Sequence, residues 1–126
     1  MNIKAISTNK APEAVGPYSQ GIKAGNLIFV SGQLPVDMET GELIKDDIKK
    51  ATRACIENIL AILGEGGASL ENIAKITIYI TDMNDFSLVN EAYGEYFNEH
   101  KPARACIEVA GLPKGVDVEI EAIAVI

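Results

Sequence analysis

Short apolar segments recur along the chain with the pattern of β-strands. In residues 73–80, isoleucine alternates with Lys75, Thr77 and Tyr79, which is the period of a strand covered on one face. Residues 27–30 are apolar at every position and are expected to be buried. In all, the pattern predicts six strands: residues 3–6, 20–24, 27–30, 73–80, 105–110 and 118–126.

Two longer segments have the period of amphipathic helices. The first is expected to begin after an N-cap at Asp46 or Asp47 and to end at the glycines of 64–67. Asn84 is predicted to cap the second, and Asn90 lies within its apolar stripe. There the Asn90 amide either satisfies a buried backbone group or reaches a bound ligand. The two stripes are Ile48, Ala51, Cys55, Ile59 and Ile62, and then Phe86, Val89, Tyr93, Tyr96 and Phe97.

Strands interleaved with two helices predict one α+β domain over residues 1–126, with both helices on one face of a mainly antiparallel or mixed sheet. No internal repeat or linker divides the sequence. The other face of the sheet then needs a cover for which the chain has no third helix. A homo-oligomer is the simplest answer.

The charge balance argues against a nucleic-acid partner. The formal net charge is −7, the pI is about 4.6, and the lysines are scattered, with only two arginines. Binding to polyphosphate depends on clustered Lys and Arg. The longest apolar runs fall well short of the roughly 20 residues of a membrane span, and residues 1–10 lack the features of a secretory signal. We therefore expect a cytoplasmic protein without a membrane partner.

One arginine and two glutamates are the main candidates for chemistry. The strand period places Arg104, Cys106 and Glu108 on one face, and Glu119 and Glu121 on a face that becomes apolar farther along. If the last two strands pair as a hairpin with Cys106 near Glu119, these groups converge at one end of the sheet. Arg104 is then either a salt-bridge partner or a bidentate carboxylate clamp. The glutamates are either a solvated strand face or a base that orients water.

Other reactive side chains give weaker signals. Cys106 has no histidine placed to activate it, so we interpret it as a packing or pocket-lining residue. His100 is the single histidine, and with two separated cysteines it makes no zinc site. Ser31-Gly32 suggests a loop whose backbone approaches another group closely, because glycine lacks a Cβ. Glycine-rich phosphate signatures are absent, so a nucleotide cofactor is not indicated.

A further signal comes from four segments spread, in order, over nearly the whole chain. They are Gly16-Pro17-Tyr18-Ser19-Gln20, then Ser31-Gly32-Gln33-Leu34-Pro35, then Asn84-Asp85-Phe86 through Asn90, and last Pro102-Ala103-Arg104 with the later Leu112-Pro113-Lys114 and Glu119-Ile120-Glu121-Ala122. Together they resemble the Rid (reactive intermediate deaminase) family, also called YjgF. The resemblance implies a chorismate-mutase-like α+β fold that assembles as a homotrimer with its sites between subunits.

The resemblance also implies a role for each matching residue. Arg104 holds the substrate carboxylate, and Glu119, rather than Glu121, positions or activates the attacking water. The residues that line or complete the site are Tyr18, Ser31, Gly32, Asn90 and Cys106. The implied reaction hydrolyses reactive 2-imino acids, among them 2-aminoacrylate, 2-iminobutanoate and 2-iminopropanoate, to 2-keto acids and ammonia, and needs no metal or organic cofactor.

Two other functions stay open at this point. A non-catalytic module could bind keto acids or related metabolites through the same Arg104 clamp, and the sequence does not separate it from an enzyme. Relatives of this family have also carried labels such as endoribonuclease or translation inhibitor. The net charge of −7 argues against that function.

Overall fold

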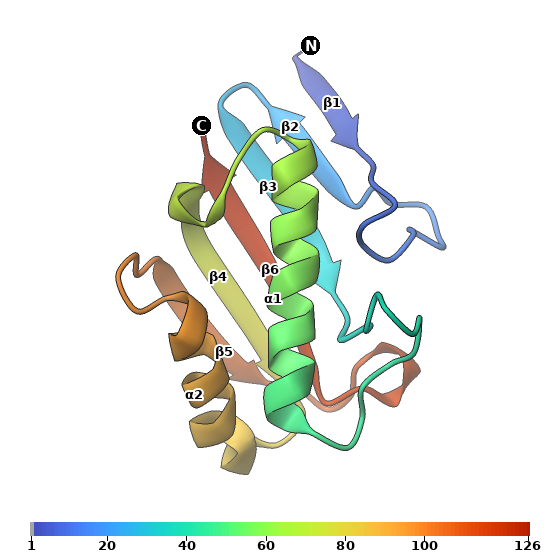
Figure 1. Ribbon diagram of the computed structural model, residues 1–126, viewed down its shortest axis with the longest axis vertical. Helices are drawn as coiled ribbons and strands as arrows, with labels where there is room; N and C mark the ends of the chain where they lie inside the picture. Colours follow the sequence, from blue (N-terminus) through green and yellow to red (C-terminus); the bar gives the residue numbers. More distant parts are fainter. Residues whose placement is uncertain (1) are drawn as a thin grey trace.

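The chain folds as one six-stranded sheet with two helices on a single face, in a computed structural model that describes residues 2–126 (Figure 1). The strands lie in the order β1-β2-β3-β6-β4-β5. Only β4 and β5 pair in parallel. The predicted α+β fold with a mixed sheet is therefore confirmed. The strands are β1 (Ile3–Ile6), β2 (Gly21–Ala24), β3 (Leu27–Gln33), β4 (Ile73–Ile80), β5 (Ala103–Glu108) and β6 (Val118–Val125), and the helices are α1 (Ile48–Glu65) and α2 (Phe86–Tyr96).

The sequence predicted the N-cap of α1 correctly but not that of α2. Asp47 caps α1, and its carboxylate accepts a hydrogen bond from the Lys50 backbone N–H at 3.0 Å. The prediction that Asn84 caps α2 is wrong. The Asn84 backbone N–H instead donates to Asp82 Oδ1 at 2.9 Å, at the start of the 3₁₀ turn η2 (Met83–Asp85) that leads into α2. Asp82 is the earlier and charged acceptor, so the capping interaction moves to it.

The hydrophobic core lies between the helices and the sheet. Every second side chain of β6 enters it, because Val118, Ile120 and Ala124 are fully buried against α1. Burying a side chain such as Val118 or Ile120 stabilises the fold by about 1.5–3 kcal/mol, so this burial fixes the orientation of the strand. The alternate residues Glu119 and Glu121 are thereby turned toward the helix-free face, where they are half-buried.

The last two strands do not form the hairpin that would place Cys106 beside Glu119, and this prediction is wrong. β5 lies at the sheet edge in parallel with β4, where Ile78 is the partner of Cys106. β6 lies between β3 and β4 and is antiparallel to both, with Tyr79 as the partner of Glu119. Because α2 supplies the crossover that a parallel β4–β5 pair requires, β5 takes the edge and residues 109–117 cross to the middle.

β3 runs farther than the predicted residues 27–30. It extends to Gln33, and its register with β6 shifts between Val30 and Gln33. Ser31 and Gly32, which the sequence placed in a loop, therefore form an irregularity within the strand. Such bulges bend a strand and change the direction of its side chains. This one lies directly beside Glu119.

The helix-free face of the sheet is partly apolar. Phe29, Ile107 and Val125 are 41%, 44% and 39% exposed, respectively. Neither α1 nor α2 covers this face (Figure 1), as the pattern of two helices predicted. Among residues 2–126, no helix is long and apolar enough to cross a membrane.

Candidate active site

A pocket of about 700 Å³ lies where β3 ends and β6 begins. Four of the predicted site residues line it, so the structure brings them together: Tyr18, Ser31, Gly32 and Glu119. Val15, Leu34 and Leu43 add apolar surface, and Lys114 adds a positive charge. A pocket with apolar walls and a few converging polar groups is the usual form of a small-molecule site.

Gly32 provides the space in which the Glu119 carboxylate lies. A Cβ at Gly32 would overlap this carboxylate and would come within 2.8 Å of its carboxyl carbon. The sequence predicted that the backbone at Ser31-Gly32 approaches another group closely. The group that approaches Gly32 within the chain is the Glu119 side chain.

The segment before β2 forms the rim of the pocket and is held by Ser31 and Gln20. Ser31 Oγ donates to the Ser19 carbonyl at 2.6 Å. Gln20 is buried, and its Nε2 donates to the carbonyl of Pro12 at 2.7 Å, while its Oε1 accepts from the Thr8 backbone N–H at 2.7 Å. The role of Gln20 was missed, since a lone glutamine between a predicted loop and a strand gives little sign of burial.

Glu119 is in an environment that favours its protonated form. The side chain is half-buried, and burial, followed by the negative charge of Glu121, raises the pKa of its carboxyl. A carboxyl group whose pKa moves toward neutrality is better matched to general acid–base catalysis. Glu119 is therefore the group in this pocket best suited to accept a proton from water.

Arg104 lies on β5 against α2. Its Nη1 donates to Asn90 Oδ1 at 2.6 Å, and its guanidinium lies 4.8 Å from the Tyr93 ring centroid and 5.5 Å from that of Phe86. These rings orient the cation by cation–π contacts. Asn90 is exposed and accepts from Arg104, so it does not satisfy a buried backbone group.

Arg104 and Glu119 do not meet within one chain. Arg104 shares the helix side of the sheet with Ile76, its partner on β4, whereas Glu119 faces the opposite side. β4 also separates the two strands that carry them. The expected convergence of the cationic and acidic groups in one subunit is therefore wrong, and the predicted residues fall into two groups on opposite faces.

Cys106 lies on the same face as Arg104 and packs against the edge of the core. Burial raises the pKa of its thiol, which favours the neutral form. His100 is engaged elsewhere, because its Nε2 lies 2.7 Å from the Ile73 carbonyl. Over residues 2–126, no three His, Cys, Asp or Glu side chains are grouped to hold a metal ion.

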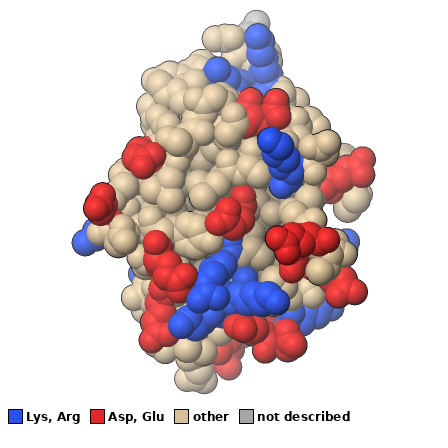
Figure 2. Space-filling model, viewed as in Figure 1, with Lys and Arg blue, Asp and Glu red and all other residues tan. Residues whose placement is uncertain are grey.

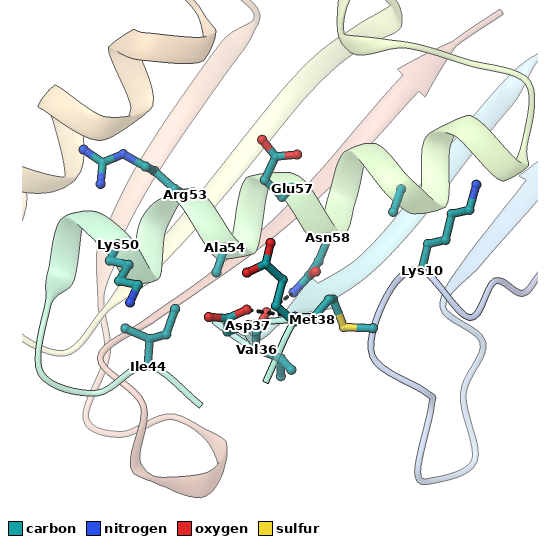
Figure 3. A pocket seen from close by; sticks show the side chains of 12 residues that line it. Lys10, Val36, Asp37, Met38, Ile44, Lys50, Arg53, Ala54, Glu57 and Asn58 are labelled. Atoms are coloured by element: carbon teal, nitrogen blue, oxygen red, sulfur yellow. Dashed lines mark hydrogen bonds between the residues drawn. The ribbon is translucent and has the colours of Figure 1, made fainter. Parts of the chain in front are cut away.

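A second groove, of about 480 Å³, runs beside α1 (Figure 3). Several of its polar groups are already paired within the chain. Arg53 makes two hydrogen bonds of 2.9 Å to Glu95, and the Asn58 amide donates to the Leu34 and Val36 carbonyls. Basic side chains gather over the lower part of this helical face, with acidic ones around them (Figure 2). The Asn58 contacts thus hold the segment after β3 against α1, and we do not assign the active site to this groove.

Comparison with known proteins identifies the family. The sequence profile of the family described as "Endoribonuclease L-PSP" matches residues 8–126. A RutC family protein of Pyrococcus abyssi is 59% identical over 121 residues, which cover 96% of this chain and 95% of that protein. The chain belongs to the Rid family, also called YjgF or L-PSP.

Other members of the Rid family carry more specific names. The 2-iminobutanoate/2-iminopropanoate deaminase of Salmonella typhimurium is 46% identical over 125 residues, covering 97% of each chain. The crystal structure of E. coli TdcF with bound serine superposes with a TM-score of 0.92 at 48% identity, covering 98% of each chain. The fold and nearly the full length of the chain are thus those of Rid proteins, some of which are named as deaminases.

Proposed function

We propose that this Rid-family chain is a 2-iminobutanoate/2-iminopropanoate deaminase of the cytoplasm. Its substrates are reactive imines and enamines such as 2-aminoacrylate, and its products are 2-keto acids and ammonia. The observation that carries the proposal is the oriented Arg104 guanidinium, held by Asn90 and two aromatic rings at the sheet edge. A planar, fixed guanidinium is the side chain suited to grip a carboxylate in a bidentate manner.

The proposed active site lies between subunits. Since Arg104 and Glu119 lie on opposite faces of one chain, a second copy must supply one of them. The partly apolar helix-free face offers a surface for that copy. We propose a homotrimer in which Arg104 of one subunit faces the Glu119 pocket of its neighbour, so that closed symmetry gives three equivalent sites.

In the proposed reaction, Arg104 fixes the substrate carboxylate and leaves the iminium carbon C2 facing Glu119. Glu119 accepts a proton from a water molecule. At the same time the water oxygen bonds to C2, and the C=N electron pair moves to nitrogen. Protonated Glu119 then returns its proton to the carbinolamine nitrogen. Ammonia leaves as the C=O bond forms, and the hydroxyl proton passes to Glu119 and from there to water. The overall change is imine plus water to keto acid plus ammonia. Tyr18, Ser31, Gly32, Asn90 and Cys106 line or support the site, and no metal or organic cofactor takes part.

The test generates the substrate in place, because free imines hydrolyse in water. A dehydratase converts serine or threonine to 2-aminoacrylate or 2-iminobutanoate, and keto-acid release is followed with and without the protein. We expect the protein to accelerate release and Glu119→Gln to lose most of that acceleration; general acid–base catalysis contributes about 10²–10⁴-fold. No acceleration by the wild-type protein would disprove the proposal.

A non-catalytic metabolite-binding module is the second candidate. It is favoured by the E. coli TdcF structure, which contains bound serine. Calorimetry with a keto acid separates the two functions, since a binding module takes up the ligand but leaves imine hydrolysis at its unaided rate. A nuclease, the activity named in the family description, is disfavoured by the net charge of −7. Nuclease activity that persists in Arg104 and Glu119 variants would identify a contaminant.

A further inference from the structure

Tyr79 and Glu121 have no part in the proposed reaction, although they adjoin Glu119. Tyr79 is the cross-strand partner of Glu119 between β4 and β6, and Glu121 lies two residues farther along β6 on the same face. Tyr79 Oη donates a hydrogen bond to Glu121 Oε1 at 2.9 Å. The Glu121 carboxylate is therefore tied to β4 beside Glu119.

Titratable groups on several elements lie around Glu119. β3 contributes none, since Ser31 and Gly32 do not titrate. The groups are Glu121 on β6, Tyr79 on β4, Cys55 on α1, and Glu13, Tyr18 and Lys114 around the pocket. Burial raises the pKa of the Cys55 thiol well above its usual range, so it stays neutral. Burial and then Glu121 raise the pKa of the Glu119 carboxyl, which makes Glu121 the charge to test.

We infer that Tyr79 and Glu121 are positioning residues for Glu119: Tyr79 anchors the Glu121 carboxylate, whose negative charge makes Glu119 a stronger proton acceptor. This inference rests on the proposed function, because it takes Glu119 as the base. A stronger acceptor removes the proton of water more readily, but it also stays protonated to a higher pH. Activity that depends on ionised Glu119 is therefore lost as the pH falls through the raised pKa of this carboxyl.

Two nearly isosteric variants test the pair through the acid limb of the kcat/KM profile. Glu121→Gln removes the neighbouring negative charge, so the acid limb should move to lower pH. Tyr79→Phe removes the donor that stabilises the ionised Glu121 carboxylate and holds it beside Glu119, so less negative charge acts on Glu119 and the limb should move in the same direction, to lower pH, by a smaller amount. In the Glu121→Gln background, Tyr79→Phe should have no further effect, because Tyr79 acts through the Glu121 charge.

A similar pair elsewhere in the fold provides matched controls. Tyr96 Oη of α2 donates to Glu57 Oε2 of α1 at 2.7 Å, in the helical layer. Tyr96→Phe and Glu57→Gln remove the same hydroxyl and the same charge as the test variants. Neither should move the acid limb, so a shift confined to the Tyr79 and Glu121 variants reports their local effect on Glu119.

A second readout separates this inference from the proposed function. The ¹³C shift of the Glu119 carboxyl, assigned through Glu119→Gln, is followed against pH in variants whose folding and oligomeric state match wild type. Its titration midpoint should fall in Glu121→Gln even if the protein hydrolyses no imine, in which case only the proposed function fails. If the midpoint and acid limb of Glu121→Gln coincide with those of wild type, the positioning role is overturned while the deaminase proposal stands.

Discussion

Arg104 takes its orientation from three side chains of α2, and this makes the fork of the guanidinium, as well as its charge, important. Arg104→Lys keeps the charge but loses the proposed bidentate grip and the guanidinium contacts with Phe86 and Tyr93. We expect kcat/KM for imine hydrolysis to fall by about 10²-fold, the effect of misplacing a substrate by about 1 Å. The melting temperature should change far less, because Arg104 is only half-buried at the sheet edge.

The control for this substitution is the only other arginine. Arg53 also makes a two-pronged contact, with Glu95, but it lies on α1 beside α2. Arg53→Lys should therefore leave imine hydrolysis close to wild type. Near-normal hydrolysis by a folded Arg104→Lys protein would mean that charge alone suffices or that the site lies elsewhere.

Cys106 shows how surroundings decide the role of a reactive side chain. Burial raises the pKa of its thiol, and the single histidine is held at the Ile73 carbonyl. Because nucleophilic cysteines need an activating base or a lowered pKa, Cys106→Ser should keep most of the deaminase activity. Progress curves of keto-acid release test this. A folded, inactive Cys106→Ser protein would point instead to covalent catalysis.

At the scale of one side chain, the sequence identified groups of suitable chemistry but not their partners. Arg104 and Glu119 were recognised from their types and from the segments around them. The contact of Arg104 with Asn90 and that of Tyr79 with Glu121 were not predicted, because each joins residues on different elements. Such contacts depend on strand order and register, which period-two patterns leave undetermined.

The bulge in β3 is the element that makes room for Glu119. Gly32→Ala would place a Cβ against the Glu119 carboxylate, which is the free end of a side chain and moves more easily than backbone. We therefore expect a small fall in melting temperature but a fall in kcat of about 10²-fold if the carboxylate moves by about 1 Å.

Gly64→Ala in α1 is the control, because a Cβ there meets nothing within 4 Å. It should leave kcat unchanged and stabilise α1 by roughly 0.5–1 kcal/mol. Equal kcat values for the two variants would disprove the role of the bulge.

The strand pattern predicted all six strands and both helices, yet it misplaced the closing strands. The glycine and proline residues between β5 and β6 are compatible with a tight turn, and sequential strands often pair. The parallel β4–β5 pair is a longer-range feature that requires α2 as its crossover. In the observed strand order, β4 lies between the strands that carry Arg104 and Glu119, so the two residues do not meet in one chain. The glycine and proline residues at positions 111–115 therefore led to the wrong prediction that Arg104 and Glu119 converge.

For the whole molecule, the split between Arg104 and Glu119 makes the proposed activity depend on assembly. Either residue alone lacks its partner, so a monomer should have the fold but not the reaction. We expect light scattering to report three chains per particle, in agreement with a helix-free sheet face that needs a cover. A clean monomer that is fully active at micromolar concentration would contradict the interfacial site.

A surface substitution tests this link between assembly and activity directly. Ile107 is 44% exposed on the helix-free side of β5, and Leu88 is 40% exposed on α2. Ile107→Glu is tolerable in an isolated chain, but it would bury an unpaired charge if a second subunit covers this face. We expect the variant to dissociate and to lose imine hydrolysis while its circular dichroism stays that of a folded α+β domain. Leu88→Glu adds the same charge on the helical layer and should stay trimeric and active. A trimeric, active Ile107→Glu protein would show that subunits meet through another surface, and the neighbour of the Glu119 pocket would then have to be sought on the helix side.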